Sequence, residues 1–179
     1  ITKPHITSGS FAHEFAHAVD NLIAYYYHKE NHGFASAGFT TAITIDTDRI
    51  KAGGFGSLCE YIFSVLYWKS ENDKTDFGER LIKQTRGGTL SDYWLRRNEV
   101  FARTFETLVS SELPRNNLML SKSGINGSDD NWQYPEKALV TKIKPVMYDF
   151  FINAVKWLNG EVVTIKSYNF NVAKEKIET

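Results

Sequence analysis

The chain has 179 residues, and its 21 Lys and Arg balance its 21 Asp and Glu, so the formal net charge is zero. This length fits one domain with its own core, and a content of 42% hydrophobic and 23% charged residues excludes a disordered, collagen-like or coiled-coil protein. The balanced charge offers no basic surface for a phosphate backbone, so no nucleic-acid partner is expected. The single cysteine, Cys59, excludes an internal disulfide and is expected to be buried packing.

The sequence predicts a soluble protein, because no apolar run approaches the roughly 18 residues of a membrane span. The chain begins at Ile1 without a methionine or a signal-peptide pattern, which favours a piece of a longer polypeptide. No repeat or linker divides it, so residues 1–179 are expected to form one domain. The sequence indicates no particular localisation.

The predicted elements are mainly helical. Ser10 is a suitable N-cap for a helix of about 20 residues that ends near Asn31–Gly33. The partly alternating segment Phe39–Ile50 predicts one strand or a hairpin. Ser57 and Asp76 each precede a glutamate by three residues, the spacing of a capping box that opens a helix. The remaining expected helices cover about Leu58–Lys69, Phe77–Gln84, Asp92–Ser111 and Pro135–Asn159. Pro145 is expected to kink or break the last of them. A terminal strand is expected over Glu161–Phe170.

The first expected helix contains His13-Glu14-Phe15-Ala16-His17, which matches the His-Glu-x-x-His (HExxH) signature of zinc peptidases. Histidines at positions i and i+4 share one helical face, where their side chains approach within about 5–6 Å, so both can reach one metal ion. Glu14 lies beside the pair, where a base acting on water belongs. The expected apolar stripe of this helix faces away from the histidines and consists of Phe15, Val19, Leu22, Ile23 and Tyr26.

The same residues have a second interpretation. His13 and His17 can be structural imidazoles, and Glu14 can be an acid that favours the positive end of the helix dipole. A histidine pair that brackets a glutamate, off the apolar stripe, favours metal binding over this alternative.

Asp20 lies one turn beyond His17 on the same stripe as the two histidines. Three ligands along an unbroken helix form a line and do not surround a tetrahedral ion. Asp20 is therefore expected to accept a hydrogen bond from a ligand histidine or another site group and to orient it, with plain solvation as the alternative. The third ligand must come from elsewhere, and helical periodicity places Glu99 on a polar face with Arg103 and Glu106, where solvation competes with metal ligation.

Two blocks, His13–Asp20 and Asn98–Phe105, resemble the zinc site of gluzincin metallopeptidases, particularly peptidase domains of the anthrax lethal factor type. The second block also resembles metallopeptidase-like domains of large polyvalent proteins of phages and mobile elements. The resemblance implies a zincin-like fold of the α+β class, mainly α-helical with a small β element. It also implies that Glu99 is the third zinc ligand beside His13 and His17.

The lethal-factor type has a catalytic tyrosine shortly before the third ligand. Tyr93 resembles it, although the family spacing is one residue longer, and a core position beside Trp94 is the alternative. The implied activity is zinc-dependent hydrolysis of a protein or peptide substrate, with Glu14 as the base and Tyr93 as a donor to the oxyanion.

The alternative function is a non-catalytic, zinc-stapled binding module of a polyvalent or toxin-like protein. Glu14 argues against this alternative, because a structural zinc site needs no base. Two histidines and one carboxylate also suit Fe(II), but the helical His-Glu-x-x-His motif favours Zn²⁺ as the cofactor.

Overall fold

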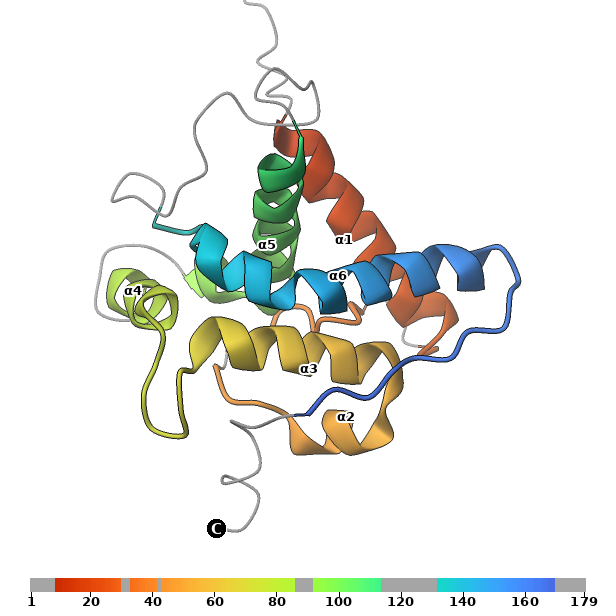
Figure 1. Ribbon diagram of the computed structural model, residues 1–179, viewed down its shortest axis with the longest axis horizontal. Helices are drawn as coiled ribbons and strands as arrows, with labels where there is room; N and C mark the ends of the chain where they lie inside the picture. Colours follow the sequence, from red (N-terminus) through yellow and green to blue (C-terminus); the bar gives the residue numbers. More distant parts are fainter. Residues whose placement is uncertain (1–8, 30–32, 42, 86–91, 114–131, 170–179) are drawn as a thin grey trace, which may run out of the picture.

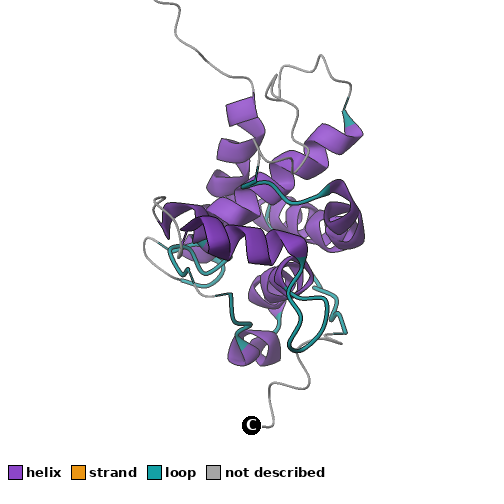
Figure 2. Cartoon of the chain, turned by 90° about the vertical axis from the view of Figure 1, so that its left-hand side faces the viewer, coloured by secondary structure: helices purple, strands orange, loops and turns teal. Residues whose placement is uncertain are grey.

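The structure, a computed structural model, describes residues 9–29, 33–41, 43–85, 92–113 and 132–169. Regular structure in these ranges is helical throughout, and they contain no strand (Figure 2). None of the described helices is long and apolar enough to cross a membrane. The elements are α1 (Gly9–Tyr26), α2 (Thr47–Ala52), α3 (Gly54–Tyr67), α4 (Asp76–Thr85), the 3-10 helix η1 (Asp92–Leu95), α5 (Arg97–Glu112) and α6 (Lys137–Leu158).

The mainly helical class is confirmed, whereas the small β element is not found among the residues that the structure describes. Residues 39–41 and 43–46 are irregular and precede α2, and residues 161–169 are irregular as well. The backbone carbonyls of Gly38 and Thr40 accept hydrogen bonds from the amides of Asn98 and Arg97 at 3.1 and 3.0 Å. These amides open α5 and have no partner within their own helix. The segment predicted as a strand therefore caps a helix instead of pairing with another strand.

The predicted capping box of Ser57 and Glu60 is also wrong, because α3 already begins at Gly54. Gly53, with φ of +73°, ends α2 and permits the abrupt turn into α3 that a side chain would strain. Glu60 is fully buried and accepts from Arg97 at 2.7 Å, and the guanidinium of Arg49 lies 3.1 Å from its other oxygen. This ion-pair network fixes α2, α3 and the start of α5 to one another.

Pro145 does not break α6, which continues through it to Leu158. The ring lies on an exposed face of the helix. Water can therefore hydrate the carbonyl that the missing proline N–H leaves free, which lowers the cost of a proline at this position.

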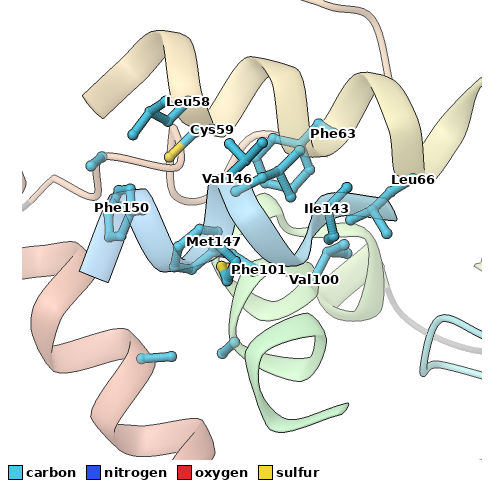
Figure 3. Close-up of a cluster of buried hydrophobic side chains, with 14 of the residues drawn as sticks. Leu58, Cys59, Phe63, Leu66, Val100, Phe101, Ile143, Val146, Met147 and Phe150 are labelled. Atoms are coloured by element: carbon cyan, nitrogen blue, oxygen red, sulfur yellow. The ribbon is translucent and has the colours of Figure 1, made fainter. Parts of the chain in front are cut away.

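The helices pack around a core to which α3, α5 and α6 contribute most of the large side chains (Figure 3). In Figure 1, α1 and α5 lie side by side, and α6 crosses in front of them above α3. Cys59 is completely buried in this core, as expected. The side chains labelled in Figure 3 are Leu58, Cys59, Phe63 and Leu66 of α3, Val100 and Phe101 of α5, and Ile143, Val146, Met147 and Phe150 of α6.

The buried face of α1 differs from the predicted apolar stripe. Val19 and Ile23 are buried as expected, but Phe15, Leu22 and Tyr26 are 40, 37 and 47% exposed. The closest packing is made instead by small residues, because Ala12 and Ala16 are at most 1% exposed. A face of alanines allows a neighbouring helix to approach closely. The histidines consequently lie on the flank of the buried face, next to α5, and not opposite the core.

Candidate metal centre

The three predicted metal ligands meet at the contact between α1 and α5. The Nε2 atoms of His13 and His17 lie 3.1 Å apart. The Glu99 carboxylate bridges them, with Oε1 3.3 Å from His17 Nε2 and Oε2 3.4 Å from His13 Nε2. One candidate ligand atom from each residue lies within 4.8 Å of the other two.

This donor set fits a tetrahedral zinc ion. Zinc bonds of about 2.0–2.1 Å at tetrahedral angles separate neighbouring ligand atoms by roughly 3.4 Å, close to the distances that the three side chains already show. Two imidazole nitrogens at 3.1 Å cannot both present lone pairs to each other without a shared proton or cation. Each histidine side chain keeps 17% of its surface exposed, so the cluster is accessible from solvent.

The opposite charges of the cluster shift the pKa values of His13 and Glu99. Burial opposes protonation of His13, but hydrogen bonds with Glu106 and Glu99 outweigh it and raise the pKa of His13 to about 9. Burial likewise opposes ionisation of Glu99, yet hydrogen bonds from His13, His17 and Tyr93 hold the pKa of that carboxyl well below its usual value. A metal ion that enters the cluster must displace the proton of His13. The carboxylates that stabilise the charge of this proton would then stabilise the charge of the metal ion.

A second carboxylate supports His13 from the other side of its ring. Oε2 of Glu106 lies 3.7 Å from His13 Nδ1, and the Tyr134 hydroxyl donates to the same oxygen at 3.0 Å. Glu106 is only 3% exposed, so the solvated polar face expected for this helix is wrong. A carboxylate at Nδ1 favours the ring orientation in which Nε2 faces the metal. The sequence signal is the i, i+7 spacing from Glu99, which puts both carboxylates on one face two turns apart.

The position of Tyr134 is fixed by α4. Arg80 donates to the Trp132 carbonyl at 3.1 Å and to the Tyr134 carbonyl at 3.2 Å, and it pairs with Glu136 at 2.5 Å. These bonds anchor the segment that precedes α6 beside α5. The support of His13 therefore extends from α5 through Tyr134 to α4.

Glu106→Gln is expected to weaken zinc affinity about 10–100-fold, because the amide is a poorer acceptor for the His13 N–H. Tyr134→Phe should shift the affinity in the same direction by less. Competition with a chromophoric chelator measures both effects. Glu112→Gln, at an exposed position of the same helix, is the matched control and should bind zinc like the wild type. Wild-type affinity in both Glu106→Gln and Tyr134→Phe would contradict the supporting role.

Asp20 is completely buried, so plain solvation is wrong for this residue. Its carboxylate accepts from the backbone N–H and the hydroxyl of Ser36 at 2.8 and 2.6 Å. Burial raises the pKa of Asp20 to about 6, although the two hydrogen bonds from Ser36 and the electrostatic effect of His17 lower it. Its described hydrogen bonds thus tie the loop of residues 33–41 to α1, next to His17. The orienting role toward a ligand histidine stays a prediction.

Tyr93 lies at the edge of the cluster and not in the core. It is 38% exposed, and its phenol is hydrogen-bonded to the Glu99 carboxylate. Burial and this carboxylate raise the pKa of Tyr93 to about 12, so the phenol keeps its proton at neutral pH. Glu14 is exposed on α1, and its charge contributes to the same shift. The structure therefore brings His13, His17, Glu99 and Tyr93 together, and Glu14 is exposed on the same helix as the two histidines.

Comparison with known proteins adds a partial match. Residues 86–156 match a family model described as large polyvalent protein-associated domain 1. The matched segment includes η1, α5 and most of α6, and thus Tyr93, Glu99 and Glu106, but not α1 with the histidine motif. The match supports the expected context of a polyvalent protein of phages or mobile elements. No curated protein and no solved structure shows significant similarity to the chain.

Proposed function

We propose that the protein is a zinc-dependent peptidase of the gluzincin type, in which His13, His17 and Glu99 hold the metal. The observation that carries this proposal is the convergence of the two motif histidines with a glutamate from a helix more than 80 residues away in the sequence. The two imidazoles are half-buried and the carboxylate is buried, and catalytic zinc sites use such a set of two imidazoles and one carboxylate. The proposal includes a zincin-like arrangement of α1 and α5.

Zinc, when bound, supplies a Lewis acid that polarises the scissile carbonyl and makes a water molecule more acidic. Glu14, exposed beside the ligand pair, accepts the proton of the attacking water on its carboxylate and passes it to the leaving amine. Tyr93 keeps its proton near neutrality, and its O–H turns from the Glu99 carboxylate to donate a hydrogen bond to the carbonyl oxygen as negative charge develops there. Glu106 and Tyr134 hold the His13 ring throughout.

The proposal is tested by incubating the zinc-loaded protein with a diverse peptide library and identifying new termini by mass spectrometry. Cleavage that disappears with a chelator and returns with zinc is the expected result. Stoichiometric zinc binding without cleavage of any peptide would favour the alternative, a binding module in which zinc stabilises the fold.

Tyr93→Phe separates a catalytic from a packing role for this residue. Loss of one donor to the oxyanion typically lowers kcat by about 10²–10³-fold. The ring is retained on a residue that is 38% exposed, so the melting temperature is expected to change little, and the three candidate ligands are intact, so the zinc content is expected to be kept. The measurement is kcat, melting temperature and zinc content of the variant beside the wild type. Near-normal turnover would exclude the oxyanion role.

A further inference from the structure

Arg96, at the rim of the candidate metal centre, has no carboxylate partner among the described residues. Among the residues that the structure describes, none places a carboxylate within ion-pair distance of the Arg96 guanidinium. Four other arginines of the described chain each pair with a glutamate: Arg49, Arg80, Arg97 and Arg103. Arg96 contacts aromatic rings instead, with its guanidinium carbon 5.2 Å from the centroid of Phe39 and 5.4 Å from that of Tyr93.

These contacts connect Arg96 to the metal ligands on both sides. On one side, Tyr93 is hydrogen-bonded to Glu99. On the other side, the Phe39 ring lies 5.7 Å from that of Phe34, which lies 6.0 Å from the ring of His17. The side chains of Phe34, Phe39, Arg96 and Tyr93 thus form a continuous rim that begins at one ligand and ends at another.

The loop that carries this rim is held firmly in place. Asp20 binds Ser36, and the Asn21 amide donates to the Gly33 carbonyl at 2.7 Å. Farther along, the carbonyls of Gly38 and Thr40 bind the first amides of α5. The Phe39 ring nevertheless keeps 61% of its surface exposed. A large exposed ring on an anchored loop, beside a cation that stacks on it, is a surface preorganised for a ligand.

We propose that Arg96 binds a carboxylate of the peptide substrate, and that Phe39 contacts the adjoining apolar part of that substrate. The inference rests on the proposed peptidase function, because it assigns the class of peptide that reaches the metal centre. Stacking on the rings orients the planar guanidinium, so that its remaining N–H groups can form the paired hydrogen bonds that a carboxylate accepts. The carboxylate belongs either to an Asp or Glu side chain near the scissile bond or to the C-terminus of the substrate.

Binding without turnover tests this proposal in the zinc-loaded Glu14→Gln variant. The probes are ten-residue peptides with blocked ends that carry one Glu at successive positions, each beside a twin with Gln at that position. A third arm uses the Gln peptides with a free C-terminal carboxylate. Isothermal titration calorimetry is expected to show about tenfold tighter binding for a Glu peptide in one register, or for a free terminus. The arm that responds identifies the source of the carboxylate.

The advantage of the carboxylate peptide should vanish in Arg96→Gln and persist in part in Arg96→Lys, both combined with Glu14→Gln. Lys83→Gln removes one exposed positive charge from α4, which contributes no residue to the rim, and should keep the full advantage. Melting temperatures verify that each variant is folded, and Arg96→Lys tests the proposal even if Arg96→Gln is destabilised. Equal affinity for every Glu and Gln pair and for free and blocked termini would overturn the proposal, as would an equal loss in Lys83→Gln.

This outcome is distinguishable from failure of the proposed activity. If the zinc-loaded wild type cleaves no peptide while binding remains dependent on Arg96, the peptidase function is wrong and the carboxylate site stands. If it cleaves peptides with no dependence on a carboxylate or on Arg96, the activity stands and the carboxylate site is wrong.

Discussion

Glu14→Gln is expected to abolish peptide hydrolysis while the protein retains one zinc ion. The amide has nearly the size and shape of the carboxylate, but it cannot accept the proton of the attacking water. Removing a general base typically costs about 10²–10⁴-fold in rate. Glu14 is exposed on α1 and is not one of the residues that cluster as metal ligands, so its replacement should alter neither zinc affinity nor stability appreciably.

The measurement is kcat/KM on a peptide found to be cleaved by the wild type, together with the zinc content of the purified variant. Glu79→Gln, an exposed glutamate in the first turn of α4, is the matched control and should retain full activity. Turnover at the wild-type level in Glu14→Gln would refute the assigned base. Loss of zinc from the same variant would instead assign Glu14 to the metal site.

Glu99→Ala is expected to weaken zinc binding by more than about 100-fold, a larger effect than replacement of a supporting residue. The reason is that Glu99 is the candidate ligand that brings α5 to the histidines and places its two oxygens 3.3 and 3.4 Å from them. The residue is 6% exposed in the first turn of α5, and alanine favours a helix, so the substitution removes the ligand and leaves the helix intact.

A competitive zinc titration and a circular dichroism spectrum of Glu99→Ala test this expectation together. Glu112→Ala, at an exposed position of the same helix, is the control for a lost carboxylate and should bind zinc like the wild type. Unchanged stoichiometric binding in Glu99→Ala would transfer the third ligand to another residue, such as Glu106. It could also transfer it to His5, which lies outside the described residues.

In the metal-free protein, Glu99→Ala should lower the free energy of unfolding through the cations that lose a partner, and not through the apolar core. In that state His13 carries the proton that balances Glu99 and Glu106, and Arg103 lies 3.5 Å from Glu99. Removal of one carboxylate therefore leaves two cations with one fewer partner, one of them the buried Arg103, while the apolar side chains of α5 are unchanged.

Local regularities explain what could be predicted from the sequence. The spacing of His13 and His17 determines that they share a helical face, because any α-helix brings positions i and i+4 together. Helix positions follow in the same way from apolar periodicity and breakers, and they were correct to within a few residues for α3 through α6. The assignment of Glu99 needed the resemblance to gluzincin peptidases, since periodicity alone left it among solvated residues.

The errors have one physical origin, which is that burial depends on neighbours distant in sequence. Glu99, Arg103 and Glu106 form a polar face that is buried because α1 and the segment before α6 cover it. Asp20 is buried for a similar reason, under the loop that carries Ser36. The predicted strand at residues 39–50 failed because the Thr40 carbonyl accepts from the first amide of α5, a demand that no local pattern reveals, and because α2 begins at Thr47.

The sequence by itself determined the histidine pair, the neighbouring carboxylate of Glu14 and the helical character of the chain, because each depends on contacts within a few residues. Only the tertiary structure decided that Glu99 reaches both histidines, that Glu106 and Tyr134 support His13, and that Arg96 stands at the rim without a carboxylate partner among the described residues. These features depend on how closely α1 and α5 approach each other. Ala12 and Ala16 are buried on α1, and their small side chains give the sequence no signal of this contact.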